Sequence, residues 1–131
     1  MLRVYRSTAG RGRLRVSALA VPTVEGVLVA VFGGERPHIG AVALAVPHPR
    51  SRGGKPTTAS TLTLPGHRDD EIARPASEEA AGRLGVPVVV AAGVHVDGAE
   101  RWEIARLVEN SLRAVERLVR RLEGGVHARG G

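Results

Sequence analysis

Short apolar runs separated by turn residues fill the first half of the chain, a pattern typical of β-strands. From residue 14 to residue 20 apolar side chains occupy every second position, which predicts a strand with one buried face. Residues 27–32 are almost continuously apolar and predict a central strand. Residues 4–7, 39–46 and 60–64 predict three further strands.

The segment after the fifth strand predicts a helix over residues 70–84, closed by Gly85. Pro75 lies within this range. Because proline lacks a backbone N–H, it either kinks the helix or is its first residue. Residues 86–96 follow with small and β-branched side chains, and Pro87 stands near their start. They predict a buried strand.

The last segment has a clear helical period. Glu109 with Arg113, and Glu116 with Arg120, have the i,i+4 spacing that favours ion pairs on its polar faces. The two glycines at 124–125 are expected to stop the helix. Apolar residues recur every three or four positions and form one stripe: Ile104, Val108, Leu112, Val115, Val119 and Leu122.

The element order β-β-β-β-β-α-β-α has closely spaced strands early and no repeated β-α-β alternation. It predicts an α+β fold, a mostly antiparallel sheet with two packed helices. We expect residues 1–131 to form a single domain, with a core at 13–122 and a tail at 124–131. Residues 47–59, rich in Pro, Gly and Ser, predict a long loop that is flexible or functional.

The composition excludes several classes of protein. There is no cysteine among the 131 residues, which excludes disulfides and cysteine-based metal or catalytic sites. No apolar stretch approaches the ~20 residues of a membrane-spanning helix, and the N-terminus lacks a secretory signal, so we expect a soluble, cytoplasmic protein. The net charge is +6, but the arginines are scattered and the few aromatic residues form no stacking platform. This argues against nucleic-acid binding.

Residue usage and patterning add two expectations. Asn110 is the only side-chain amide and Met1 the only methionine. This depletion of thermolabile residues fits a thermophilic source, although a GC-rich genome explains the arginine bias equally well. The apolar strands and the amphipathic helix give more apolar surface than two helices cover. We therefore expect a homodimer, formed through one sheet face or the final helix.

Three histidine-containing motifs lie where apolar runs meet turns, a common place for functional side chains. The first joins two predicted strands and contains Gly33, Gly34, Arg36, His38 and Gly40. Its glycines would let the backbone approach an anion or a ring, and its N–H groups could form a phosphate-binding nest. A tight turn explains the same glycines. The common phosphate-loop and dinucleotide fingerprints are missing.

The second motif, His67, Arg68, Asp69 and Asp70, directly precedes the first predicted helix. Asp69 or Asp70 would serve as its N-cap, because a carboxylate accepts the free N–H groups of the first turn. His67 and Arg68 would grip a phosphate or another anion beside the positive helix end. Capping explains the aspartates but leaves the histidine and the arginine without a role.

The third motif places His95 and Asp97 on one face at the end of a strand. Asp97 and Glu100 also have the spacing of a capping box for the final helix. A histidine that closes a buried strand needs a partner, which favours a functional role for His95. Three histidines and a carboxylate are possible zinc ligands, but no His-x-His or His-x-x-x-His spacing is present, so we expect no metal.

Three motifs together resemble the small D subunit of gallate and hydroxybenzoate decarboxylase systems, the prenylated-flavin chaperone family. They occur in the same order and at comparable spacing, over roughly residues 16–118. The departures are the long loop at 47–59, an arginine after His67 where lysine is common, and a glycine after Asp97. The motifs are Gly33-Gly34-x-x-Pro37-His38-Ile39-Gly40, His67-Arg68-Asp69-Asp70-x-Ile72-Ala73 and Gly93-Val94-His95-Val96-Asp97.

The resemblance implies a non-catalytic accessory protein that supplies prenylated FMN, or FMN, to a partner decarboxylase. In such a site Gly33 and Gly34 would allow close approach, and Arg68 and Arg36 would meet the phosphate. A fainter resemblance, in element order only, to proteasome-assembly-chaperone domains also favours a homodimer. The family motifs carry over a site at His38, Gly40, His67, Asp69, Asp70, His95 and Asp97.

Two other hypotheses stay open. One is a metal-assisted or histidine-based hydrolase or lyase built from His38, His67, His95 and Asp97. The other is a purely structural assembly subunit, in which the motif histidines are buried pins between loops. The first predicts a bound metal or a reaction, and the second predicts that removing a histidine mainly lowers thermal stability.

Overall fold

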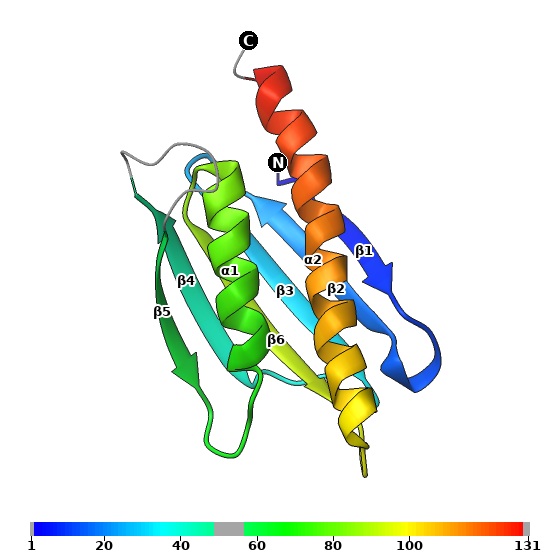
Figure 1. Cartoon of the computed structure of the whole chain (residues 1–131). Coiled ribbons are helices and arrows are strands. Elements are labelled where there is room, and N and C mark those ends of the chain that lie inside the picture. The colour runs from blue at the N-terminus through cyan, green and yellow to red at the C-terminus, as the bar shows by residue number, and fades with distance from the viewer. Residues whose placement is uncertain (1, 49–56, 130–131) are drawn as a thin grey trace.

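The computed structural model describes residues 2–48 and 57–129, which form one mixed sheet and two helices (Figure 1). The strand order is β1-β2-β3-β6-β4-β5, and neighbouring strands are antiparallel except for the parallel pair β3–β6. The predicted α+β class is confirmed. The elements are β1 (Tyr5–Ala9), η1 (Gly12–Leu14), β2 (Val16–Pro22), β3 (Val27–Gly34), β4 (Ala41–Pro47), β5 (Thr57–Thr63), α1 (Asp70–Leu84), β6 (Val88–His95) and α2 (Arg101–Arg129).

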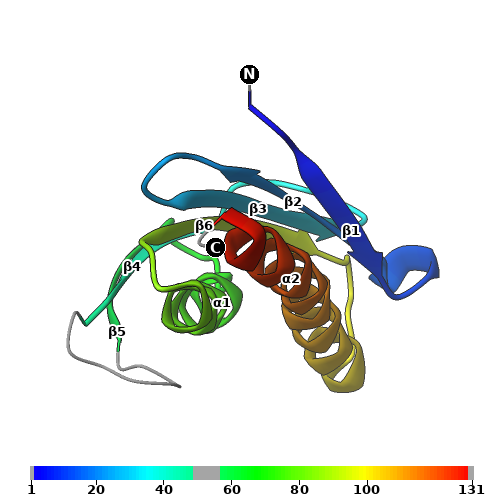
Figure 2. The same ribbon diagram turned by 90° about the horizontal axis from the view of Figure 1, so that it is seen from above.

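Both helices cover the same face of the sheet, as the view along the layers shows (Figure 2). The covered face is built from alternate strand positions, and Val31 of β3 and Val90 of β6 are fully buried on it. On β4 these positions are alanines, and α1 packs against them with alanines of its own, including Ala73 and Ala80. Small side chains on both surfaces let this helix approach the sheet closely.

No helix of the described chain covers the opposite face of the sheet (Figure 2). That face carries partly exposed apolar side chains. Leu28 and Leu44 are about half exposed there, at 46% and 42%. Both lie opposite Val89 of the central strand β6, in one row across the sheet. This face, defined by Leu19, Leu28, Phe32, Val42, Leu44 and Val89, is called the open face below.

Several predicted strand boundaries were displaced. Strand β5 begins at Thr57, three residues earlier than expected, so the loop predicted at 47–59 is shorter at both ends. Residues 49–56 of that loop lie outside the described residues. Threonines 57 and 58 pair with Pro47 and Val46 of β4, and this pairing favours the strand where composition alone suggested a loop.

The helices correct two expectations. Helix α1 begins at Asp70, so the interpretation in which Pro75 is its first residue is wrong; Pro75 lies in the second turn. Helix α2 continues through the glycines at 124–125 to Arg129, so the predicted stop is wrong. Glycine lowers helix stability by ~1 kcal/mol, and a glycine that closes a helix commonly does so by adopting positive φ. Gly85 does adopt it, with φ 70°, and closes α1 as predicted.

The polar faces of α2 follow the prediction. Glu109 pairs with Arg113 and Glu116 with Arg120, each at 2.9 Å. Arg83 of α1 also contacts Glu116 and thereby links the two helices. Ion-pair networks of this kind are common in heat-stable proteins, but a thermophilic source stays a prediction. Neither helix of the described chain is both long and apolar enough to cross a membrane; the cytoplasmic location also stays a prediction.

A bidentate salt bridge joins the start of α2 to the β1–β2 connection. Arg13 donates from Nε and Nη2 to the two carboxylate oxygens of Glu103, at 2.9 and 2.8 Å. Glu103 also accepts the N–H of Glu100, at 3.1 Å. The hydrogen bonds from Arg13, and then that from Glu100, hold the pKa of Glu103 below its ordinary value.

We predict that Arg13→Met lowers the melting temperature at pH 7, because Glu103 then loses the guanidinium that stabilises its charge. A carboxyl whose pKa is lowered by folding contributes stability above its unfolded pKa, and this is lost as the pH falls through the folded value. The difference from wild type should therefore shrink below about pH 4. Thermal unfolding between pH 3 and pH 8 measures this.

The matched control is Arg113→Met, which removes an exposed i,i+4 pair with Glu109 and should change stability little. Equal losses in the two variants, or a loss for Arg13→Met that persists undiminished at low pH, would contradict the assignment.

Candidate functional site

The three histidine motifs meet at one end of the sheet, where the parallel central strands β3 and β6 end side by side. Because these strands are parallel, Gly34 pairs with His95 at their carboxyl ends. Strand β6 lies between β3 and β4, so the β3–β4 connection must cross over the end of β6. It is fastened there by backbone hydrogen bonds from Glu35 to the His95 carbonyl, at 2.7 Å, and from Gly40 to Ala92, at 2.9 Å.

Asp69 is the centre of the site. Its side chain is only 6% exposed, and Oδ1 accepts the backbone N–H of Val94 at 3.0 Å. The other oxygen, Oδ2, lies 3.0 Å from His38 Nε2 and 3.9 Å from His67 Nδ1. One buried carboxylate therefore connects the β3–β4 connection, the end of β6 and the segment before α1.

The aspartates do not cap α1 as predicted. Asp69 occupies the N-cap position, but its side chain makes no capping hydrogen bond, and Asp70 already belongs to the helix. The carboxylate of Asp69 is instead engaged by His38 and Val94. The capping box predicted for Asp97 and Glu100 is also displaced, because Glu103 accepts the N–H of Glu100 directly before α2.

The imidazoles cluster around Asp69. The rings of His38 and His67 have centroids 4.6 Å apart, and those of His38 and His95 are 6.5 Å apart in an edge-to-face arrangement. His38 is the most enclosed, at 23% side-chain exposure against 40% for His67 and 48% for His95. The fold thus brings together three histidines that are separated by about thirty residues in sequence.

His95 belongs to a second, more exposed group. Its Nε2 lies 3.0 Å from Asp97 Oδ1, and Arg36 pairs with the other Asp97 oxygen at 3.2 Å. The Asp97 N–H donates to Glu35 at 3.1 Å. These contacts hold the β6–α2 connection against the β3–β4 connection. Asp97 and Arg36 remain more than half exposed at the rim.

The glycines of the first motif serve close backbone packing. Gly34 has φ 76°, and a Cβ there would lie 2.3 Å from the His95 carbonyl oxygen. The N–H groups of Gly34, Glu35 and Arg36 donate to the carbonyls of Arg15 and His95. They are therefore not free to form a phosphate-binding nest. The tight-turn interpretation holds only in part: Gly34 has a positive φ but Gly33 and Gly40 do not, and the segment is a six-residue connection that crosses the end of β6.

Gly40 and Gly93 leave room for His38 and Asp69. A Cβ on Gly40 would lie 1.8 Å from Asp69 Oδ2 and 3.0 Å from His38 Nε2. A Cβ on Gly93 would lie 1.7 Å from the His38 carbonyl oxygen. Neither glycine has a positive φ, so space and not backbone conformation excludes a side chain at these positions.

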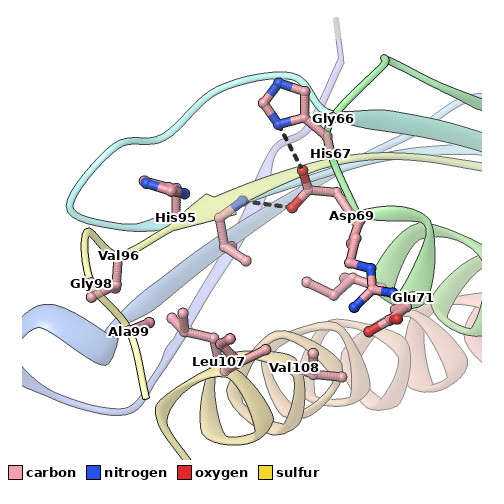
Figure 3. Close-up of a pocket in the computed structure, with 14 residues that line it drawn as sticks. Gly66, His67, Asp69, Glu71, His95, Val96, Gly98, Ala99, Leu107 and Val108 are labelled. Atoms are coloured by element: carbon pink, nitrogen blue, oxygen red, sulfur yellow. Dashed lines mark hydrogen bonds and ion pairs between the residues drawn. The ribbon is translucent and has the colours of Figure 1, made fainter. Parts of the chain in front are cut away.

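A pocket of about 380 Å³ opens between this cluster and the start of α2. His67 and Asp69 lie on one side of it and His95 on another, opposite Leu107 and Val108 of α2 (Figure 3). Arg68 is the fourth predicted site residue in its lining. The full lining is Gly66, His67, Arg68, Asp69, Glu71, Ile72, Val94, His95, Val96, Gly98, Ala99, Ile104, Leu107 and Val108.

The sequence did not predict the apolar part of this lining as a functional surface. The sequence placed Ile104 and Val108 in the stripe of the last helix that packs on the core. In the structure Ile104 is 49% exposed, and the fully covered part of α2 begins farther along the helix. An apolar helix stripe that extends one turn beyond the sheet indicates an apolar binding surface. The helical period of the sequence does not show where the sheet ends, so it could not predict this surface.

The fold occurs in a solved structure. It is similar to a chain in the crystal structure of a novel chaperone complex for yeast 20S proteasome assembly, with a TM-score of 0.61 and 15% identity, over 95% of this chain and 98% of that chain. At this identity the similarity shows a shared fold, and it confirms the fainter of the two resemblances. No curated protein matches the chain.

The family follows from the sequence. The model of the prenylated flavin chaperone LpdD-like domain matches residues 10–123, which include all three histidine motifs. The chain belongs to this family of prenylated flavin chaperones, as its motifs had indicated.

We predict that Gly40→Ala separates His38 from Asp69 and destabilises the fold by about 1–3 kcal/mol, the usual cost of overpacking. The new methyl group would occupy the position of the Asp69 carboxylate. Denaturant unfolding measures the loss, and histidine side-chain NMR signals report the displaced pair. Gly124→Ala is the control, because a Cβ there meets no atom within 4 Å and alanine favours a helix. A variant at Gly40 as stable as wild type would contradict the geometry.

Proposed function

We propose that this protein is a non-catalytic chaperone that binds prenylated FMN and delivers it to a partner decarboxylase. Membership of the prenylated flavin chaperone family carries the proposal. The family also implies a flavin-dependent partner enzyme. The ligand site we propose is the pocket between α1, the end of β6 and the start of α2.

The chemistry of this pocket supports the proposal. Its volume falls in the range of small-molecule sites, and Leu107, Val108 and Ile72 give it an apolar wall. Polar side chains, among them His67 and His95, stand on the other side. A prenylated flavin is amphipathic in the same sense, because an apolar ring edge and prenyl group adjoin a polar pyrimidine edge and a phosphate.

Arg68 is the residue we assign to the phosphate. It lines the pocket directly before α1, where the positive helix end also favours an anion. Arg36 is a weaker candidate, because it is already paired with Asp97. His67 and His95 would hydrogen-bond the phosphate or the polar edge of the ring. Gly33, Gly34 and Gly40 would act indirectly, through the backbone and side-chain positions described above.

The decisive experiment is a titration of the purified protein with FMN and with reduced and oxidised prenylated FMN, followed by fluorescence and calorimetry. We predict saturable binding of a prenylated form, weakened about tenfold or more in Arg68→Ala, because a hydrogen bond to a charged group contributes about 1.5–3 kcal/mol. The control is Arg74→Ala, which removes an arginine of α1 that pairs with Glu78 on the surface. Absence of binding, with or without a decarboxylase partner, would refute the proposal.

The hydrolase or lyase hypothesis gains one specific observation, the proximity of His38, His67 and Asp69. If His67→Ala lost both flavin binding and an enzymatic activity, the hydrolase or lyase hypothesis would stay open. A reaction catalysed by the protein without any flavin and without a partner enzyme would favour this hypothesis. The structural-subunit hypothesis predicts instead that His38→Ala and His95→Ala lower the melting temperature, and that partner activation falls only in proportion to the folded protein.

We also propose that the protein is a homodimer and that the open face is its interface. The row Leu28, Val89 and Leu44 lies on the central strands, and the two helices leave it uncovered. A surface of this kind usually marks an interface, and a two-fold dimer is its commonest closed form. The alternative surface predicted from sequence, the final helix, is largely used to cover the other sheet face.

We predict that Leu28→Arg converts the dimer to a monomer at micromolar concentration, because a dimer would have to bury the new charge. Light scattering gives the mass directly. Val24→Arg is the control, since Val24 is fully exposed in the β2–β3 turn, away from the sheet face. A monomeric wild-type protein, or equal effects of the two variants, would overturn the assignment.

A further inference from the structure

Both ring nitrogens of His38 have a close oxygen partner. Nδ1 lies 3.0 Å from the carbonyl oxygen of Arg36, which can only accept, so Nδ1 carries a hydrogen. The other ring nitrogen, Nε2, lies 3.0 Å from the carboxylate oxygen Oδ2 of Asp69. An imidazole nitrogen and a carboxylate oxygen placed in this way can share a proton, or they can bind one metal ion together.

We propose that this cluster binds a divalent transition-metal ion, held by His38 Nε2, a ring nitrogen of His67 and Asp69 Oδ2. Ligand atoms of the three residues lie within 4.8 Å of one another. Zinc bonds of about 2.1 Å at tetrahedral angles place ligand atoms about 3.4 Å apart. The distances from Asp69 Oδ2 to His38 and to His67, 3.0 and 3.9 Å, bracket that value.

The surroundings of the three ligands have the form of a metal site's outer shell. A histidine that binds a metal usually donates its second N–H to a carbonyl or carboxylate, as His38 does to Arg36. A ligating carboxylate is usually held by a further hydrogen bond, as Asp69 Oδ1 is by the Val94 N–H. A Cβ on Gly40 would overlap Asp69 Oδ2, so the glycine lets this oxygen and His38 Nε2 lie close together.

The donor set defines the class of ion. Two imidazoles and one carboxylate suit zinc and iron(II), whereas magnesium and calcium prefer oxygen ligands alone. Three protein ligands leave at least one coordination position open. Because His67 and Asp69 both line the pocket, a ligand in the pocket would lie beside the ion. The sequence argued against a metal because it has no His-x-His or His-x-x-x-His pair. That argument fails here, since the ligands come from two separate connections of the fold.

The test uses untagged protein, stripped with a chelator and titrated with Zn²⁺ by calorimetry and with Co²⁺ by visible absorption. Wild type should bind one equivalent and give the intense d–d bands of a low-coordinate cobalt site. His67→Ala and His38→Ala should lose more than the roughly 100-fold that loss of an outer-shell partner can cost. His67 is 40% exposed, so its variant should fold normally, as circular dichroism will verify.

The matched controls are His95→Ala, in the neighbouring group with Asp97, and His48→Ala, which contacts Thr58 far from the site. Both should bind Zn²⁺ as wild type does. No saturable 1:1 binding by wild type, equal losses in the control variants, or a doubly protonated His38 in NMR spectra recorded with Zn²⁺ present would overturn the proposal. Flavin titrations on chelator-stripped protein test the proposed function separately, so the two can fail independently.

Discussion

The arrangement of the site depends on the buried carboxylate of Asp69. A charged group at this depth is costly unless hydrogen bonds satisfy it, and Asp69 finds them on two different segments, at Val94 and at His38. The carboxylate therefore fixes the end of β6, the β3–β4 connection and the start of α1 relative to one another. Gly40 and Gly93 are glycines because a side chain on either would displace part of this arrangement.

The division of the molecule into two faces follows from its small size. Two helices cover one face of a six-stranded sheet, and each has an apolar side that the sheet buries. The chain has no further element with which to cover the other face in the part that the structure describes. The proposed ligand pocket and the proposed dimer interface therefore lie on different surfaces. The pocket is at the carboxyl end of β6 on the helix side of the sheet, and the open face is on the opposite side.

Much of the fold was predictable from sequence because its signals are local. The helix at 70–84, the alternation in β2 and the ion pairs of α2 depend on spacing within a few residues, and the structure confirms them. The resemblance in the three motifs likewise identified the family. The errors arose where a local rule met a competing tertiary contact. Asp69 resembled an N-cap, but a histidine thirty-one residues earlier and a strand that follows it engage its carboxylate.

The strand order has a consequence for how the chain folds. Strands β3 and β4 are separated by only six residues, yet β6, which comes after α1, lies between them. A simple hairpin of β3 and β4 would be the faster product, since closing a short loop costs less entropy than long-range pairing. The native sheet requires that β6 enter this gap. Because Val94 and His95 enter with it, the cluster around Asp69 forms only when the last strand is in place, and its integrity reports the completion of folding.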